Sequence, residues 1–266
     1  MSKQKKDVEK RWPDDPMLIQ VIGGVVDVQE RKFISHGIHA HKSVPTGYYF
    51  IPANFTGKKS PRWQQFLDEV LPGDEGKIFQ RQLQKFFGYC LLRDCRYSKA
   101  LVLCGSGPCG KSLILNVLIA MLGEDNVMAP CASVSELIQN SFRIIELKNR
   151  LAILLQKSLI PTEKDSIAFK QIVSGDSPGH FKYQPDENFY NFAKIVFNTN
   201  DMQHSRAQAL PSLFSRLVII NFPGILSTEE INTQLSNQII EQIDGVFTWA
   251  LHGLYALLDD GGFEDE

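Results

Sequence analysis

The chain has 266 residues, 43% of them hydrophobic, and a formal net charge of −2 at pH 7, as expected of a soluble globular protein with a sizeable core. No apolar run reaches the roughly 18 residues of a membrane helix, and the charged start of the chain is unlike a secretory signal, so we expect a cytoplasmic protein without a membrane partner. The near-neutral charge neither indicates nor excludes nucleic-acid binding, because a ring or groove can concentrate a few basic side chains.

The pattern along the chain predicts four regions. Residues 1–16 are polar, contain two prolines and are expected to form a flexible N-terminus. Residues 17–97 are expected to form a leader of short strands and a helical collar. Residues 98–224 alternate between strand and helix patterns, and residues 225–266 are expected to form C-terminal helices and an acidic tail.

Two short strands are predicted in the leader, at residues 21–28 and 47–51. The loop between them contains His36, His39 and His41. Three histidines are able to bind a metal ion, but without a nearby carboxylate pair or cysteine we favour solvated loop residues. The five cysteines of the chain show no paired metal-ligand spacing, which predicts a reducing compartment and no structural zinc.

The second half of the leader predicts two helices. Ser60 is a suitable N-cap and Pro61 suits the first helical position, so a helix is expected over residues 63–71. A Pro-Gly break at residues 72–73 separates it from a second helix that continues to Leu91. Their apolar spacing predicts a packed helical collar rather than a ligand site.

Four core strands are predicted, and one helix is expected to begin at a capping box at Thr162. Strands that alternate with helices indicate a parallel sheet with crossover helices, hence an α/β fold. The predicted strands cover residues 100–104, 151–155, 194–199 and 217–221. Beyond the core, a helix is expected from Ser227 through Phe247, followed by helical residues 249–258.

The most specific motif follows the first core strand and fits the phosphate-binding pattern G-x-x-x-x-G-K-[ST]. Its glycines let several backbone N–H groups converge on a polyphosphate. Lys111 supplies a charge to the outer phosphates, and Ser112 supplies a hydroxyl for Mg²⁺. The strand before the motif and a predicted helix over residues 113–122 give it a context that a chance Gly-rich turn lacks. The predicted nucleotide-binding residues are Gly105, Ser106, Gly107, Pro108, Cys109, Gly110, Lys111 and Ser112.

Two further polar residues lie at strand ends. Asn200 directly follows the strand 194–199, at the end that faces the ligand crevice of a parallel sheet. It suits either a residue that orients the water attacking the γ-phosphate or an ordinary strand-to-loop cap. Arg216 precedes the strand 217–221 and suits either a finger that reaches the γ-phosphate of a neighbouring subunit or a rim charge. The residues alone leave both alternatives open.

Several segments in order resemble the superfamily 3 helicase domain, in the branch of phage, plasmid and poxvirus primase–helicases. The resemblance spans about residues 20–224. It rests on the segments 105–112, 170–176, 195–200 and 216–222 of the core and on 24–27, 61–67 and 87–91 of the leader. It implies an AAA+-like P-loop NTPase core that takes ATP and Mg²⁺. It also implies a homo-oligomeric ring, usually a hexamer, that acts on single-stranded DNA.

The resemblance also assigns roles to residues. Lys111 and Ser112 would hold the phosphates and Mg²⁺, Asn200 would be the sensor, and Arg216 would be a finger acting in trans. The segment 175–183 would correspond to a hairpin that projects into the DNA channel. There Lys182 and His180 would meet phosphates while Phe181 or Tyr183 stacks on bases. An ordinary Pro-Gly hairpin remains the alternative.

One departure from the family pattern concerns hydrolysis. The family's strand after the phosphate loop ends in acids that bind Mg²⁺ and polarise the attacking water, whereas this strand ends in Gln156 and Lys157. Glu163, Asp165 or Asp176 would have to substitute, although none lies at the expected place. Loss of the water-positioning group lowers the rate by orders of magnitude while nucleotide binding survives. A smaller departure is Cys109, where this branch usually has Asn.

Three functions therefore compete. The first is an ATP-dependent DNA helicase or translocase of a mobile element's replication system, assisted by a primase or replication-initiation protein. The second is an ATP- and DNA-binding ring or adaptor that hydrolyses little or no ATP, because Gln156 and Lys157 replace the acids. The third is a P-loop small-molecule kinase, which explains the phosphate loop but neither Asn200 nor Arg216.

Overall fold

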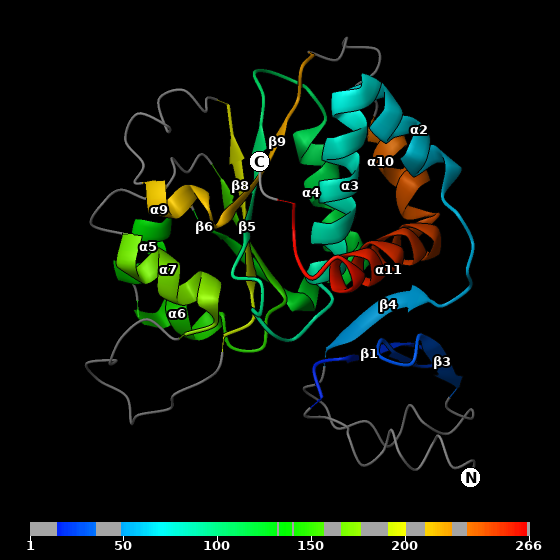
Figure 1. Ribbon diagram of the computed structural model, residues 1–266, viewed down its shortest axis with the longest axis horizontal. Coiled ribbons are helices and arrows are strands. Elements are labelled where there is room, and N and C mark those ends of the chain that lie inside the picture. Colours follow the sequence, from blue (N-terminus) through cyan, green and yellow to red (C-terminus); the bar gives the residue numbers. More distant parts are fainter. Residues whose placement is uncertain are drawn as a thin grey trace.

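The computed structural model describes residues 15–35, 49–131, 133–139, 141–156, 166–176, 191–200, 211–224 and 233–264. Two sheets and their helices make up the described part of the chain (Figure 1). The smaller sheet belongs to the leader, and the larger parallel sheet belongs to the core. This confirms the α/β class and a parallel sheet flanked by helices.

The leader sheet has four strands in the order β3-β2-β1-β4. They are β1 (Leu18–Ile22), β2 (Gly24–Asp27), β3 (Lys32–Ser35) and β4 (Phe50–Asn54). The prediction of one strand over residues 21–28 was wrong, because the chain turns at Gly23 and β1 pairs with β2 in an antiparallel hairpin. The later strand, predicted over residues 47–51, overlaps β4 at Phe50 and Ile51, and β4 continues to Asn54.

Two helices lie in the second half of the leader, as predicted. Helix α2 (Pro61–Val70) begins after Ser60 with proline at its first position, and α3 (Gly73–Tyr89) begins at the glycine of the Pro-Gly break. Trp63 and Phe66 of α2 are buried, as are Phe86 and Phe87 of α3. Burial of these aromatic side chains stabilises the two helices by the hydrophobic effect, which contributes about 25 cal/mol for each Å² of apolar surface removed from water.

The core sheet has five strands, all parallel, in the order β6-β7-β8-β5-β9. Four match the predicted strands: β5 (Ala100–Cys104), β7 (Ala152–Gln156), β8 (Lys194–Thr199) and β9 (Leu217–Asn221). The fifth strand, β6 (Val127–Cys131), was missed.

Helices cover both faces of the core sheet (Figure 1). Alternate residues of each strand supply the two faces, so that Leu101 and Leu103 of β5 pack with α3 and with α4 (Lys111–Leu122), while Val102 packs on the other side. Burial on both faces explains the nearly continuous apolar runs of these strands. The second face carries α5 (Val134–Gln139), α6 (Ser141–Glu146), α7 (Ser166–Ser174) and α9 (Pro211–Phe214).

The C-terminal region forms α10 (Thr233–Ile240) and α11 (Ile243–Asp259). The continuous helix expected up to Phe247 is therefore interrupted at residues 241–242. Helix α11 packs against α3 of the leader at glycines on both helices: a Cβ on Gly88 would lie 2.3 Å from Leu254 N, and one on Gly253 would lie 2.1 Å from Gln84 O. Among the described residues, no helix is long and apolar enough to cross a membrane.

Candidate nucleotide site

The predicted nucleotide site lies at the carboxyl edge of the core sheet. Because β5, β7 and β8 are parallel, the segments that follow them emerge at the same edge. The phosphate loop follows β5, and its last residues begin α4, whose positive end therefore faces the loop. This is the arrangement in which backbone N–H groups converge on an anion.

Glycine is required at two points of the loop. Gly110 has a φ of +94°, and a Cβ there would lie 2.9 Å from Phe66 Cζ. Gly105 lies so close to its neighbours that a Cβ would come within 2.8 Å of Cys109 Sγ and 2.9 Å of Phe222 Cβ. The spacing of glycines in the motif thus corresponds to a tightly wound loop with little room for side chains.

Lys111 turns back over this loop. Its side chain is buried, and Nζ donates to the carbonyl oxygen of Gly105 and lies 3.2 Å from Cys109 Sγ. The ammonium therefore lies within the concave loop where an anion would be bound. Ser112, in the first turn of α4, is exposed and so is open to a metal ion.

Asn200 is adjacent to the start of the loop. Thr199 pairs with Cys104 across the two central strands, and the Gly105 N–H donates to Thr199 O at 3.3 Å. Asn200 is the next residue and is exposed, so it lies beside the first glycine of the loop. Its position agrees with either of its predicted roles, sensor or cap.

The third strand end at this edge belongs to β7. Gln156 is its last residue and pairs in register with Asn198 of the neighbouring strand β8. The family's acids would lie at this strand end. Lys157, Glu163 and Asp165 lie outside the described residues.

Arg216 lies at the opposite edge of the sheet from the phosphate loop. Its carbonyl oxygen accepts from the N–H of Ala100, the first residue of β5, at 2.8 Å. Five residues of strand, about 16 Å, separate this point from the loop. In this conformation the guanidinium therefore does not reach the phosphate loop of its own chain.

Asp176 lies at the same amino edge as Arg216. It follows α7, whose last residue, Ser174, lies within 3.4 Å of Ser98 just before β5. Asp176 is therefore remote from the loop of its own chain and does not replace the missing acids there.

The sequence did not indicate that the leader supports the loop. Phe66 and Val70 of α2 both approach Gly110, at 2.9 and 3.1 Å from the position of a Cβ. The spacing of Phe66 and Val70 in the sequence indicated only that one face of α2 is buried. The contact between α2 and Gly110 could be predicted only from the tertiary packing of α2, which the sequence pattern does not give.

A buried basic residue was also missed. Lys194, the first residue of β8, is fully buried, donates through Nζ to Leu92 O and lies 4.8 Å from the centre of the Tyr89 ring. Burial lowers the pKa of this amine. Since Tyr89 and Leu92 belong to the leader, Lys194 joins the leader to the core sheet.

Other predicted site residues fall outside the described part of the chain. These are the DNA-binding candidates His180, Phe181, Lys182 and Tyr183 and the three loop histidines. Within the described residues, no cluster of histidine, cysteine or acidic side chains is arranged to hold a metal ion. The five cysteines are buried and form no disulfide.

Two family models match the chain. One is described as "D5 N terminal like" and matches residues 3–72, and the other is a family of unknown function, DUF5906, which matches residues 103–209. No curated protein matches the chain.

Solved structures share the fold. The apo structure of the NrS-1 C-terminal region (residues 305–718) is 15% identical, with a TM-score of 0.55 over 80% of this chain and 54% of that one. Its A form is 16% identical, with a TM-score of 0.54 over 76% and 49%. The present chain thus spans about half the length of the structures it matches. The chain thus carries a D5-like segment at residues 3–72 and shares its fold with the NrS-1 C-terminal region.

Proposed function

We propose that the chain is the ATP-dependent motor of a mobile element's replication system, a helicase or translocase that acts as a ring on single-stranded DNA. The observation that carries the proposal is the phosphate loop itself. Lys111 is buried within a loop wound around two sterically required glycines, at the positive end of α4. ATP and Mg²⁺ are the ligands that such a loop, with Ser112 exposed beside it, is suited to bind.

The placement of Arg216 supports a ring. An arginine at the edge of the sheet remote from its own loop contributes to phosphoryl transfer only when it meets the loop of a neighbouring subunit. Such a finger in trans accelerates hydrolysis by about 10³–10⁵-fold in related chemistry. A homo-oligomer, hexameric as the family resemblance implies, would bring the two edges together.

A second function is favoured by the end of β7. With Gln156 there, and with Asp176 at the opposite edge, a water-activating carboxylate remains unidentified among the described residues. The alternative is a ring or adaptor protein that binds ATP and single-stranded DNA but hydrolyses ATP slowly or not at all. A primase or replication-initiation protein is the natural partner of either form.

One experiment separates the two. ATP turnover is measured with and without single-stranded DNA for the wild type, Lys111→Ala and Arg216→Ala. Turnover that DNA stimulates and that both substitutions remove supports the motor. Tight ATP binding with background turnover in the wild type rejects the motor in favour of the adaptor. Mass measurement with ATP and DNA tests the ring, and a monomer under all conditions contradicts both.

A further inference from the structure

A groove lies between the coil that leads into α2, helix α2 itself and α11. It has a volume of about 770 Å³, within the range of small-molecule sites, and its lining includes Lys58, Lys59, Pro61, Trp63, Trp249 and His252. We call it the collar groove. Helix α2 separates it from the phosphate loop, because Phe66 and Val70 approach Gly110 while Pro61 lines the groove.

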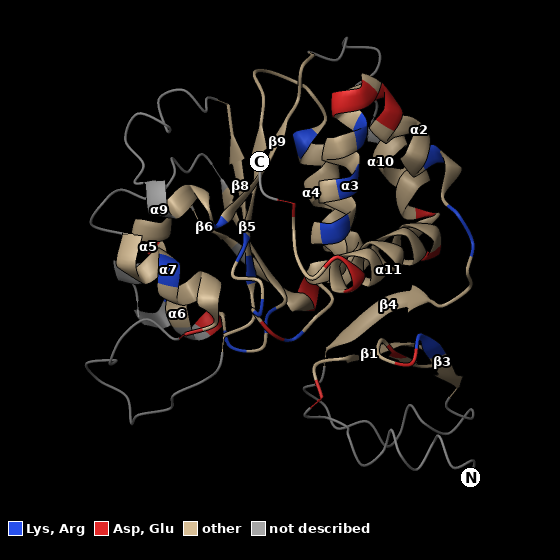
Figure 2. Ribbon diagram, in the orientation of Figure 1, with Lys and Arg blue, Asp and Glu red and all other residues tan. Residues whose placement is uncertain are grey.

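One end of the collar groove suits an anion. Lys58 and Lys59 are exposed in the coil just before α2, where Figure 2 shows a basic stretch. The N-termini of α2 and α11 both open here. The N-terminus of α2 carries a partial positive charge with no acid in its first turn, whereas Asp244 offsets that of α11. The two ends are held together, because Ser60 Oγ donates to Gln242 Oε1 at 3.0 Å. This end is therefore preorganised for negative charge.

The body of the groove is aromatic. Trp249 and His252 lie one helical turn apart on α11, with Trp249 half-buried and His252 exposed. The Trp249 ring meets Trp63 edge-on, with 5.4 Å between ring centres. The indole N–H of Trp63 is buried and has no acceptor among the described residues. Planar groups stack on such side chains, and a ligand oxygen would satisfy a free indole N–H.

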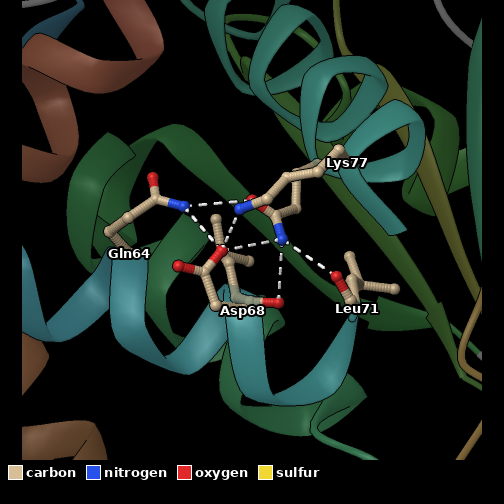
Figure 3. Close-up of polar contacts among 6 residues, drawn as sticks. Gln64, Asp68, Leu71 and Lys77 are labelled. Carbon is tan, nitrogen blue, oxygen red and sulfur yellow. Dashed lines mark hydrogen bonds and ion pairs between the residues drawn. The ribbon is translucent and has the colours of Figure 1, made fainter. Parts of the chain in front are cut away.

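The two acids that line the groove are already compensated. Asp68 accepts from Lys77 and, at 3.1 Å, from Gln80 (Figure 3). Although slight burial opposes it, these hydrogen bonds lower the pKa of Asp68. Glu69 lies 3.5 Å from Arg62 Nη1. Neither carboxylate therefore presents an unbalanced charge to an anion at the other end of the groove.

We propose that the collar groove binds a nucleotide unit, with its base against Trp249 and His252 and its phosphate at Lys58 and Lys59. The unit is either one residue of a single-stranded nucleic acid or a free nucleotide, which share this chemistry. The site is separate from the phosphate loop and does not depend on ATP turnover. It would give the leader and α11 a shared nucleotide site, outside the predicted channel hairpin.

The test is the binding of a labelled oligothymidylate to the full chain without ATP, followed by fluorescence anisotropy at several salt concentrations. Lys58→Gln/Lys59→Gln is expected to weaken binding about tenfold. It should also lower the slope of log affinity against log salt by about 0.7 for each phosphate that a lysine no longer neutralises. Lys32→Gln/Lys148→Gln removes the same charge elsewhere and is expected to change affinity by less than about twofold. His252→Ala, at an exposed position, tests stacking without disturbing the core.

A titration with thymidine monophosphate distinguishes a free nucleotide from a residue of single-stranded nucleic acid as the ligand of the groove. Titrations in the Lys111→Ala chain exclude binding at the phosphate loop, and tryptophan fluorescence follows occupation of the groove. Competition by the mononucleotide supports a free nucleotide, and a response to the strand alone supports nucleic acid. Equal affinity of the two lysine double variants overturns the proposal. So does a fluorescence signal that neither ligand changes, which would leave the groove as a surface for a protein partner.

Discussion

Arg216 donates a hydrogen bond from Nη1 to Ser174 Oγ at 2.9 Å, at the edge of the core sheet opposite to the phosphate loop. Ser174 is the last residue of α7, and Arg216 precedes β9. The guanidinium is half-buried and oriented by this contact. An oriented arginine far from its own loop is of use to phosphoryl transfer only at a subunit interface.

Complementation between two inactive variants tests this directly. Lys111→Ala and Arg216→Ala are each expected to lose DNA-stimulated turnover. In an equimolar mixture, about a quarter of the interfaces in a ring would join an intact loop to an intact arginine, so turnover should return. Ser174→Ala, which removes only the orienting hydrogen bond, should lower turnover much less than Arg216→Ala. A mixture as inactive as its components would contradict action in trans.

Gly110→Ala is expected to destabilise the protein and abolish nucleotide binding. A residue with a Cβ is strained at a φ of +94°, by about 1–2 kcal/mol, and the added atom would also lie 2.9 Å from Phe66. Gly261→Ala is the matched control, because Gly261 also has a positive φ (+73°) but nothing within 4 Å of the added atom. Urea unfolding should show a larger decrease in stability for Gly110→Ala. Equal decreases would mean that the collar does not press on the loop.

The elements that the sequence predicted well are those with strong local signals. Ser60 and Pro61 mark the start of α2, and the apolar runs of β5 and β8 were placed within a residue of their bounds. Strand β6 was missed because Pro130 lies inside it. Proline is tolerated there because β6 is the edge strand of the sheet. Gly23, within an apolar run, concealed the hairpin between β1 and β2.

Of the candidate site, only the residues of the phosphate-binding motif could be predicted from the sequence. The loop and its Lys111 follow from local spacing. In contrast, the opposite placement of Asn200 and Arg216 depends on the direction and register of strands that are distant in sequence. The contact between α2 and Gly110 and the collar groove are likewise tertiary. Local patterns carry no information about which faces of these helices meet.

Stability at alkaline pH should depend on Cys90. Burial raises the pKa of this thiol to about 12 from its ordinary 9.0, against the opposing charge of Lys194. The folded state therefore holds the proton more tightly, so this contribution to stability is complete below about pH 9 and is lost between about pH 9 and 12. Lys194 acts with the opposite sign, because burial lowers its pKa and stability rises as pH approaches its ordinary value of 10.5.

Urea unfolding at about pH 8 and about pH 10 measures the effect. Between these values the wild type should lose about 1 kcal/mol more than Cys90→Ala, since a pKa shift of one unit corresponds to 1.36 kcal/mol. The cavity left by Cys90→Ala lowers stability at both pH values and cancels in the comparison. Parallel pH dependence of the two proteins would show that Cys90 is already accessible to base in the folded state.

Gln80→Leu is expected to destabilise the collar by about 1–3 kcal/mol. Gln80 is buried and donates to the carbonyl oxygens of Leu67 at 3.2 Å and Leu71 at 2.9 Å (Figure 3). Leucine would remove this donor from the Leu71 carbonyl, whereas the Leu67 carbonyl still accepts from the backbone N–H of Leu71 at 2.9 Å. Gln65→Leu removes only an exposed bond to Glu69, one turn along the same helix, and should cost less than about 0.5 kcal/mol. Similar midpoints for the two variants in thermal unfolding would show that water satisfies the Leu71 carbonyl.

The end of β7 offers the most direct test of whether the chain is a motor or an adaptor. If hydrolysis is limited by the lack of acids there, Gln156→Asp/Lys157→Glu should raise ATP turnover by at least about tenfold, because a water-positioning group contributes orders of magnitude to such reactions. ATP affinity should change little, since Lys111 and the loop remain intact. Gln156→Asn/Lys157→Gln controls for loss of the lysine charge and should leave turnover at the wild-type level. If the wild type already turns over rapidly and the acidic pair adds nothing, the water must be activated by a carboxylate from elsewhere. Glu163 and Asp165 would then be the next residues to replace.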